Sequence, residues 1–468
     1  MIIDSEPFDL SVGSGTFASD LAARTSGTVL CPGDDGFDGA VAPFNLTVKH
    51  RPDAVLVAAD AEDVVVGVQT AVAHGRRVAV QATGHGAAPT LPGTLLISTR
   101  LLDQVTIDPA ARTATVGAGV RWQQVLEAAA PYGLTGLCGS APAVGVVGYT
   151  LGGGLGPIAR TYGFAADRLI GVELVTADGS RRIVNEGNDP ELLAGLRGGG
   201  GAFGVVVAMT FGLIPLSTVY AGGAYFHADV TRTVLQQWAA WSRDLPEQAS
   251  TSIARLNLPP DPALPAPLRG AAVVHVRYAY VGDSDDGRRL IAPLLAAAPA
   301  LLTTIDTIPT TALGSVHADP VQPMPVLEGG VLLRELPAAA VERFTEITSP
   351  GAGLPIAVAE LRLLGGALRG PGSAGADALT GRDAAYHLHT VAVPGLPLPT
   401  GPAEAVRQVA EALAPWSTGQ VLHNFSGGAD PATRAALRQS WPAERHARQQ
   451  ALRDRLDPGR VFDPMARW

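Results

Sequence analysis

The segment Gln81–Gly86 places one histidine between two glycines, directly after the strand-like run 77–80. Glycine readily adopts left-handed backbone angles and lets the chain approach a ligand closely, so His85 is presented to a ligand instead of being packed away. Two interpretations remain open for this histidine. Its imidazole is a covalent handle for a cofactor, or it only satisfies nearby carbonyl groups in a polar turn.

Two further glycine-rich segments follow along the chain. The span Pro142–Gly156 holds six glycines, and successive backbone N–H groups exposed in this way form the concave sites that bind a pyrophosphate. The second segment, Arg197–Gly204, contains four consecutive glycines and enters the β-rich run Val205–Phe211. Because such a run costs conformational entropy, it indicates a backbone pressed against something flat or bulky.

A rival interpretation concerns Gly154–Ala159, which superficially matches the glycine fingerprint of Rossmann dinucleotide-binding domains, with Glu173 further on. That fingerprint needs a preceding strand at the start of a βαβ unit, whereas a glycine loop precedes it here. A purely structural alternative, tight glycine turns in a β-rich domain, also stays open.

The composition excludes several classes of protein. A chain of 468 residues and 48.0 kDa with 47% hydrophobic and 16% charged residues predicts a globular protein of about two or three domains. The formal charge is -9 and the arginines form no basic stripe, so we expect no nucleic-acid partner. Lys49 is the only lysine among abundant Ala, Gly and Pro, which is typical of a GC-rich bacterial genome.

The chain shows no targeting or membrane signal. Met1–Asp9 carries acids in place of a basic signal-peptide start, and the longest apolar runs are of strand length, so we expect a cytoplasmic protein with no membrane partner. Cys31 and Cys138 cannot form a disulfide framework, and neither has a metal-ligand spacing. We therefore expect a reducing compartment and no metal site.

The order of predicted elements indicates an α+β protein. Residues 54–81 read as strand, helix and strand, and short β segments follow to residue 116. After Pro215 come longer alternating strands without regular intervening helices, which predict a separate domain with a mainly antiparallel sheet. The predicted division is 1–215, 216–414 and a helical C-terminal segment 415–468.

The three glycine segments and the tail together carry a family resemblance. Thr83–Gly86, Pro142–Gly156, Arg197–Gly204 and the tail motifs Val421–Phe425 and Arg453–Phe462 resemble, in this order, the berberine-bridge-enzyme-like branch of the vanillyl-alcohol oxidase and p-cresol methylhydroxylase superfamily. The resemblance implies a two-part FAD-binding domain of the PCMH type, to which residues 415–468 return. It also implies a substrate domain whose antiparallel sheet is covered by helices.

By the same resemblance the cofactor is FAD, bonded covalently through His85 to its 8α-methyl carbon. A neutral imidazole nitrogen is a competent nucleophile for such a bond. The residues expected to bind the flavin are Ala82, Thr83, Gly84, His85, Gly86, Ser140, Gly145, Val147, Gly148, Tyr149, Gly152, Gly153, Gly154, Gly156, Gly200, Gly201, Phe203, Gly204, Val206, Asn424 and Phe425.

Two positions depart from the family pattern. Doubly linked members carry a cysteine where this chain has Ala141, and Cys138 lies three residues too early, so we expect a single covalent link. A thioether from Cys138 to the flavin stays an alternative, beside its interpretation as a small buried apolar residue. Carbohydrate-oxidising relatives have a tyrosine where this chain has Leu422, which puts sugar oxidation in doubt.

The catalytic base must then come from elsewhere. Glu360 shares one face of the predicted strand 356–364 with Arg362, and Tyr149 is the second candidate. For Glu360 a surface ion pair is the alternative. His387 and His389 are interpreted as ordinary strand residues.

The sequence thus predicts an FAD-dependent oxidoreductase, an oxidase that transfers hydride from a small organic substrate to covalent flavin and tailors a secondary metabolite. Dioxygen is the expected reoxidant. Alternatives are flavin-dependent cyclisation, rearrangement or monooxygenation, a carbohydrate or alcohol oxidase, or a flavin-binding protein that has lost catalysis. The oligomeric state is not predicted.

Overall fold

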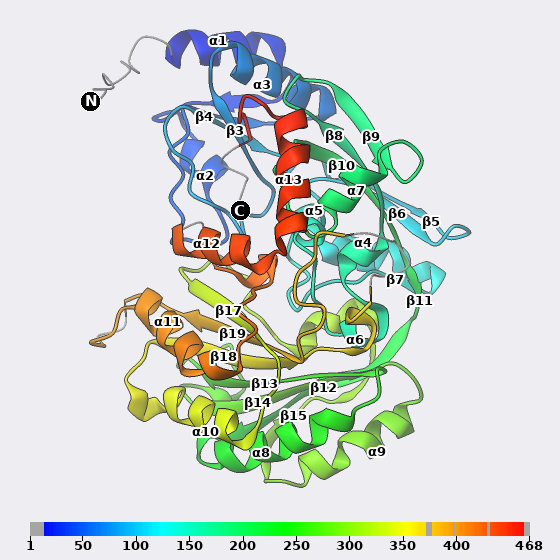
Figure 1. Cartoon of the computed structure of the whole chain (residues 1–468), viewed down its shortest axis with the longest axis vertical. Coiled ribbons are helices and arrows are strands. Elements are labelled where there is room, and N and C mark those ends of the chain that lie inside the picture. Colours follow the sequence, from blue (N-terminus) through cyan, green and yellow to red (C-terminus); the bar gives the residue numbers. More distant parts are fainter. Residues whose placement is uncertain (1–13, 371–376, 396–397, 428–430, 463–468) are drawn as a thin grey trace.

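The structure is a computed structural model that describes residues 14–370, 377–395, 398–427 and 431–462, the side chains of 431–434 excepted. The signal-peptide prediction for Met1–Asp9 therefore lies outside the described residues. Figure 1 shows two parts along the long axis of the molecule. The sheets and helices of the N-terminal half form one end, and a large sheet with its helices forms the other.

The first sheet contains the predicted strand-helix-strand unit. Its strands follow the order β1-β2-β4-β3, with β2 and β3 parallel to β4 and β1 antiparallel to β2. Asp60 caps the helix of the unit by accepting a hydrogen bond from the Asp63 N–H. The elements are β1 (Thr28–Leu30), β2 (Ala54–Val57), β3 (Arg77–Gln81), β4 (Thr94–Ser98), α1 (Ser14–Arg24), α2 (Phe37–Val41) and α3 (Ala61–Ala73).

The second sheet is antiparallel, with strand order β5-β6-β10-β8-β9. Asp189 caps α7 by accepting a hydrogen bond from the Leu192 N–H, and the run Asn188–Glu191, with its proline at the first helical position, is a sequence pattern typical of such a helix start. The elements are β5 (Val105–Asp108), β6 (Thr113–Gly117), β8 (Leu169–Val175), β9 (Arg181–Asn185), β10 (Val205–Gly212), α4 (Trp122–Ala129), α5 (Val146–Leu151), α6 (Ala159–Tyr162), α7 (Pro190–Leu196) and the short pair β7 (Leu134–Thr135) and β11 (Ile214–Pro215).

The third sheet has eight strands, all paired antiparallel, in the order β15-β12-β14-β13-β18-β19-β17, with β16 also on β12. The mainly antiparallel sheet is thus confirmed. Its strands are β12 (Thr218–His227), β13 (Ala249–Asn257), β14 (Ala272–Tyr280), β15 (Ala300–Thr303), β16 (Asp306–Pro309), β17 (Leu327–Leu333), β18 (Ile356–Leu363) and β19 (Tyr386–Ala392).

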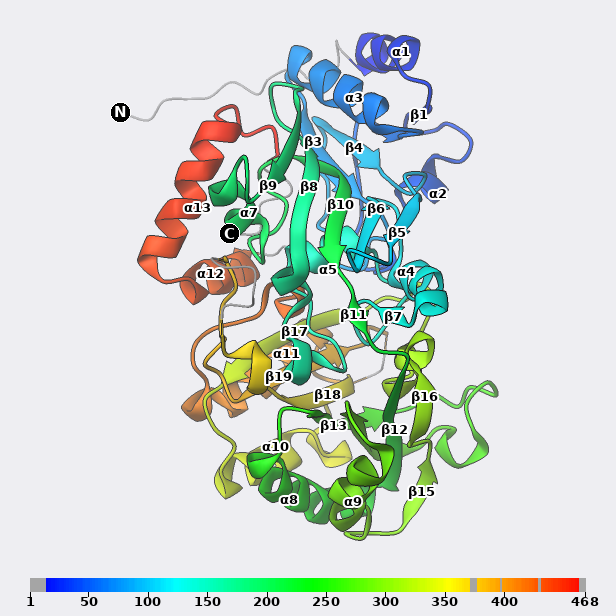
Figure 2. The same cartoon turned by 90° about the vertical axis from the view of Figure 1, so that its right-hand side faces the viewer.

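The prediction of strands without regular intervening helices is wrong. Helices α8 (Thr231–Trp241), α9 (Ser284–Leu295), α10 (Ala338–Ile347) and α11 (Pro402–Ala412) connect or follow these strands. They cover one face of the sheet (Figures 1 and 2), where apolar side chains such as Trp238, Phe344 and Leu361 form a core. The opposite face of this sheet is turned toward the N-terminal half of the chain.

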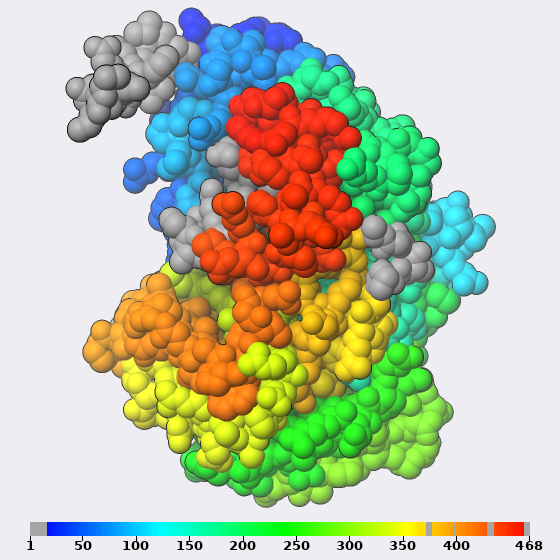
Figure 3. All heavy atoms as spheres, in the orientation of Figure 1, coloured from blue at the N-terminus to red at the C-terminus, as the bar shows by residue number. Residues whose placement is uncertain are grey.

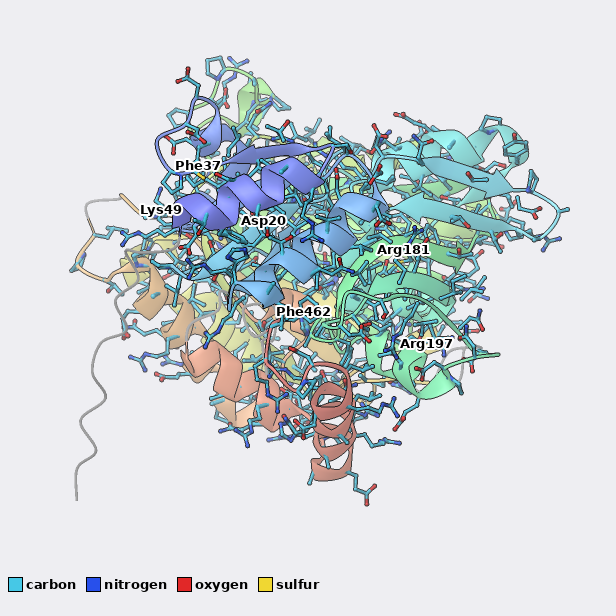
Figure 4. The ribbon with its side chains drawn as sticks, turned by 90° about the horizontal axis from the view of Figure 1, so that it is seen from above. Asp20, Phe37, Lys49, Arg181, Arg197 and Phe462 are labelled. Atoms are coloured by element: carbon cyan, nitrogen blue, oxygen red, sulfur yellow. The ribbon has the colours of Figure 1, made fainter. Side chains whose placement is uncertain are left out.

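The tail returns to that N-terminal half. Its helices are α12 (Pro431–Ser440) and α13 (Ala443–Leu456), and α13 lies beside α7 (Figures 1 and 3). Leu452 and Phe462 join the same hydrophobic core as the first two sheets, and the Val78 N–H donates to the Val461 carbonyl at 2.8 Å. Figure 4 labels Phe462, which is fully buried.

Candidate functional site

The His85 loop follows β3 and is fixed by neighbours on both sides. The imidazole stacks on Phe44 with 3.8 Å between ring centroids and an interplanar angle of 13°. Its Nδ1 lies 2.9 Å from the Thr83 hydroxyl, while its buried Nε2 has no hydrogen-bond partner within the described part of the chain. Gly84 has a φ of +74°, and a Cβ there would lie 2.6 Å from Pro43, so only glycine fits.

Burial and, to a smaller extent, Arg121 lower the pKa of the His85 imidazole to about 4, against the opposing effect of Glu328. The ring is therefore neutral near pH 7, which is the protonation state that a nucleophilic nitrogen needs. Glu328 lies on β17 of the third sheet, so the electrostatic coupling links the His85 loop to that sheet.

The Pro142–Gly156 loop meets the His85 loop at its first glycine. A Cβ on Gly145 would lie 3.6 Å from Ala82 and 3.7 Å from Thr83, whereas one on Gly148 would meet nothing within 4 Å. Gly153 and Gly154 have φ angles of +107° and +76°. The loop therefore combines left-handed glycines with an open position at Gly148.

The Arg197–Gly204 segment is anchored at its start and strained along its length. The Arg197 side chain, labelled in Figure 4, is 3% exposed, donates to the Leu169 carbonyl at 2.8 Å and pairs with Glu186 at 2.7 Å. Positive φ angles occur at Gly198, Gly200 and Gly204. Among the four consecutive glycines, Gly198 and Gly200 are therefore the left-handed positions.

The tail motif closes over the second glycine loop. The Asn424 amide donates to the Tyr149 carbonyl at 2.9 Å, and a Cβ on Gly152 would overlap the Asn424 side-chain oxygen. Phe425 lies under the Arg362 guanidinium, whose central carbon is 5.1 Å from the ring centroid. The tail thus joins the glycine loop to strand β18 of the third sheet.

The structure brings the remaining sequence-predicted binding residues into the same region. Ser140 hydrogen-bonds Asp319, which precedes the third sheet's β17. Val147 and Phe203 are buried in the main core of the N-terminal half. The other predicted positions, Gly86, Gly156 and Val206, lie on the His85 loop, at the end of the second glycine loop and on β10.

Cys138 and Tyr149 are both buried beside the second glycine loop. The Cys138 side chain is 1% exposed, and burial raises the pKa of its thiol to about 12. Burial also raises the pKa of the Tyr149 phenol well above its ordinary value, and its ring packs edge-on against Trp122 at 5.7 Å. Neither side chain is ionised near neutral pH, which argues against Tyr149 as a base and against Cys138 as a thiolate.

Glu360 lies at the centre of a buried ionic cluster on the opposite face. It is 1% exposed, so the surface ion pair considered from the sequence is wrong. Arg277 Nη1 lies 2.7 Å from its Oε1 and Arg362 Nη2 lies 2.8 Å from its Oε2. The Ser252 hydroxyl donates to Oε1 at 2.6 Å, and His317 Nε2 lies 3.3 Å away.

This cluster sets the charge of the Glu360 carboxyl. Burial alone would raise its pKa, but Arg362, Arg277 and His317 outweigh burial and hold the pKa well below its ordinary value. Burial and Arg277 lower the pKa of His317, so that ring is neutral. Glu360 is therefore ionised throughout the neutral pH range.

The sequence analysis missed four members of this cluster: Ser252, Arg277, His317 and Asp319. Ser252 and Arg277 come from strands β13 and β14, and the register pairs them directly with each other. Arg277 and His275 stand two residues apart in an otherwise apolar strand, and this alternation was the signal that could have found them. His317 follows the 3-10 helix Thr310–Val316, which has no sequence pattern of its own.

His387 and His389 lie on the same polar face. The register pairs His387 with Arg362 and His389 with Glu360 across β18 and β19. His387 is fully buried, and burial lowers the pKa of its imidazole well below the ordinary value. His389 Nε2 lies 3.1 Å from Glu328 Oε2. Both rings contact Phe425, with centroids 4.6 and 5.0 Å away.

A pocket between the second glycine loop and this polar face is the candidate substrate site. Leu155 and Gly156 line it from the loop, and Ser252, Arg277, His317 and Arg362 line it from the cluster around Glu360. Residues of the predicted flavin loop and of the ionic cluster thus share one pocket.

The residues present fit FAD. The three glycine segments provide backbone with left-handed glycines at Gly153 and Gly200, and an open position at Gly148. His85 adds a neutral imidazole with one nitrogen lacking a partner in the described residues.

Comparison with known proteins agrees with this reading. Residues 52–185 match the family described as "FAD binding domain". (R)-6-Hydroxynicotine oxidase of Paenarthrobacter nicotinovorans is 30% identical over 289 residues, 59% of this chain and 60% of that protein. FAD-linked oxidoreductase OXR1 of Pyricularia oryzae is 40% identical over 154 residues, 32% of this chain and 30% of that protein.

Solved structures match over almost the whole chain. The crystal structure of 6-hydroxy-D-nicotine oxidase from Arthrobacter nicotinovorans superposes with a TM-score of 0.80 at 24% identity, covering 94% of this chain and 96% of that one. Physcomitrella patens BBE-like 1 gives 0.81 at 20% identity, covering 96% and 98%. These likenesses confirm the predicted α+β fold with its PCMH-type FAD-binding domain.

Residues 52–185 thus form an FAD-binding domain within a fold shared with flavin oxidases. The match to the FAD-binding domain and these structural likenesses agree with the resemblance of the motifs to berberine-bridge-enzyme-like FAD-linked oxidoreductases. Its alignments cover only 60%, 56% and 62% of the lengths of the first three curated relatives. No helix in the described residues is long and apolar enough to cross a membrane.

Proposed function

We propose that this chain is an FAD-dependent oxidase of a small organic substrate, with the flavin bonded to His85 and with domains at 1–215, 216–414 and 415–468. The observation that carries the proposal is the pocket in which Leu155 and Gly156 of the second glycine loop face the Glu360 cluster. A redox cofactor on one side and a buried, charged, hydrogen-bonding wall on the other are the two parts that a flavin oxidase needs.

The flavin side of this site is assigned to the loops. The backbone N–H groups of the Gly145–Gly156 and Gly198–Gly204 segments hold the pyrophosphate and the ring edges, and Asn424 fixes the loop from behind through the Tyr149 carbonyl. When bound, FAD supplies two-electron chemistry by accepting a hydride equivalent and passing it on to an oxidant. Cys138 forms no second link, because its thiol is protonated and buried.

The substrate side is assigned to the Glu360 cluster. Oε1 of Glu360 is occupied by Ser252, Arg277 and His317, whereas Oε2 pairs with Arg362 among the described residues. Oε2 therefore has spare acceptor capacity for a hydrogen bond from an O–H or N–H of the substrate. Arg277 and Arg362 hold the carboxylate in place.

Glu360 serves as the proton acceptor in this proposal, although its pKa is low. A substrate O–H or N–H becomes far more acidic as hydride leaves the adjacent carbon, so a weakly basic carboxylate suffices at that moment. The phenol of Tyr149 stays protonated and acts as a neutral hydrogen-bonding group. We assign no role in proton transfer to His387 or His389.

The proposed substrate class follows from the apolar residues around Leu422. Leu422 is 4% exposed and packs with Leu155, Phe164 and Leu379, so this position contributes apolar surface where carbohydrate-oxidising relatives have a tyrosine hydroxyl. We therefore propose a substrate less polar than a sugar, such as an intermediate of secondary metabolism. The proposal also includes dioxygen as oxidant and a cytoplasmic location.

Anaerobic mixing of the holoenzyme with candidate alcohols, amines and phenols, followed by air, tests this function. A substrate should bleach the flavin absorbance, and air should restore it with one equivalent of hydrogen peroxide. A product formed without bleaching would instead support cyclisation or rearrangement.

Monooxygenation is the second candidate, since FAD-dependent monooxygenase FUP4 of Fusarium proliferatum is 31% identical over 208 residues, 43% of this chain and 40% of that protein. Incorporation of labelled oxygen from dioxygen into the product would favour it.

A further inference from the structure

A second cavity, of about 580 Å³, lies on the other side of Arg160 from the substrate pocket. Arg160 and Leu363 line both spaces and so form the wall between them. Four arginines line this cavity, Arg160, Arg243, Arg334 and Arg369, and we call it the arginine pocket. Its volume falls within the range of small-molecule sites, which is roughly 300–1,000 Å³.

Arg160 is the buried member of this set. It is 7% exposed, and its guanidinium donates to the carbonyls of Ala249 at 2.7 Å and Leu245 at 2.9 Å, and to that of Leu364. Burial and, to a smaller extent, Arg369 lower the pKa of Arg160, Tyr386 and Glu247 oppose the shift, and the pKa is about 10. The side chain is still protonated near pH 7, so its charge is solvated by carbonyl dipoles and not neutralised by a carboxylate.

Arg369 brings a second positive charge to the same turn. A Cβ on Gly365 would lie 3.3 Å from Arg160 Nη1 and 3.3 Å from Arg369 Nε, so both groups converge on this glycine, whose φ is +87°. Two guanidinium groups held this close repel each other unless an anion lies between or beside them.

The other two arginines add charge without compensation. Arg334 donates to the carbonyls of Pro415 and Ser417. Within the described ranges, no carboxylate lies in ion-pair distance of Arg160, Arg243, Arg334 or Arg369. Glu247 and Glu335 also line the pocket, and two carboxylates against four guanidinium groups leave an excess of two positive charges.

We propose that the arginine pocket binds a small doubly charged oxyanion, of the phosphate monoester or dicarboxylate type. Arginine is suited to this because its planar fork donates two parallel hydrogen bonds to such groups. The excess charge matches a dianion, and the apolar walls from Leu245, Leu336 and Leu363 accommodate a short carbon skeleton. This site is separate from the flavin loops and does not depend on the proposed oxidase function.

The test uses the flavin-loaded full-length protein and sodium phosphate as the probe. Phosphate replaces sodium chloride step by step, so that the ionic strength stays constant. The melting temperature should rise with phosphate and saturate, as a site that binds only the folded state requires. Arg243→Gln/Arg369→Gln should weaken the apparent affinity roughly tenfold or more, as expected when two charge-assisted contacts are lost. Succinate, titrated in the same way, distinguishes a dicarboxylate site from a phosphate site.

The matched control is Arg289→Gln/Arg407→Gln, which removes the same charge from two exposed arginines. These pair with Asp286, Glu404 and Glu411 of their own helices, away from the pocket. The control should keep the wild-type affinity. Two results would overturn the proposal. One is a melting temperature that rises with phosphate and with succinate but never saturates. The other is an equal loss of affinity in the pocket variant and in the control variant. An unchanged flavin spectrum in each variant verifies that it is folded.

Discussion

The Asn424 side-chain amide donates a hydrogen bond to the backbone carbonyl of Tyr149 at 2.9 Å, which joins the C-terminal tail to the second glycine loop. The same asparagine occupies the space that a side chain at Gly152 would need. The tail therefore acts as part of the flavin site, because it holds the loop in the conformation that exposes its backbone. Glycines in and facing this loop that combine a positive φ with a blocked Cβ position should tolerate no larger residue.

We predict that Gly153→Val and Gly200→Val each abolish flavin loading. Both positions have positive φ angles, and a Cβ would lie 2.6 Å from Leu379 at Gly153 and 2.7 Å from His423 at Gly200. Gly75→Val is the matched control, because its φ is +64° but no atom lies within 4 Å of its Cβ position. The ratio of flavin absorbance to protein absorbance measures loading. Full loading of either site variant would contradict the assignment.

We predict that Leu422→Tyr does not create a carbohydrate oxidase and lowers the melting temperature. Leu422 is buried in an apolar cluster with Leu155, Phe164 and Leu379, so a phenol there overpacks the cluster at a cost of about 1–3 kcal/mol. Differential scanning calorimetry and an oligosaccharide panel check this. Leu422→Met is the control with conserved volume, and sugar oxidation by the tyrosine variant would refute the role given to this position.

Local patterns predicted the strands, the helix of residues 61–73 and the capped start at Asp189, since each depends on neighbours in sequence. The three glycine segments predicted closely approached backbone, and FAD was implied only by their family resemblance. The Glu360 cluster was not predictable in full. Arg277 and His317 reach Glu360 only through strand register and a loop, which are set by tertiary packing. The helices between the strands were missed although α9 has a clear start signal in Asp283, whose carboxylate caps it.

We predict that Glu360→Gln slows flavin reduction by roughly 10²–10⁴-fold, the usual scale for a lost general base. Reoxidation by dioxygen should change little, so anaerobic stopped-flow on a true substrate separates the two steps. Because the pKa of Glu360 lies well below its ordinary value, the wild-type reduction rate should show no titration of this group between pH 6 and 8. Glu346→Gln, an exposed glutamate, is the control. Near-wild-type reduction in Glu360→Gln would remove Glu360 from proton transfer.

We predict a pH-dependent stability difference between the wild type and Glu360→Gln. Removing the carboxylate leaves Arg277 and Arg362 buried without their partner, at a cost of about 3–5 kcal/mol near pH 7. A depressed pKa stabilises the fold above the unfolded-state pKa of about 4.3, and that stabilisation is lost as pH falls through the folded-state pKa. The gap in melting temperature should stay constant from pH 7 to 5 and narrow below pH 4. A gap that widens on acidification would contradict the ion-pair account.

The measurement that tests the central claim most directly is the intact mass and visible spectrum of the acid-denatured protein. The neutral His85 imidazole, held by Phe44 and Thr83, predicts one covalently bound FAD per chain, so the denatured wild type stays yellow and carries the mass of one flavin. His85→Ala should release its flavin on denaturation, while His74→Ala, which alters a histidine paired with Asp20, should keep it bound. A colourless wild-type protein of unmodified mass would contradict the account.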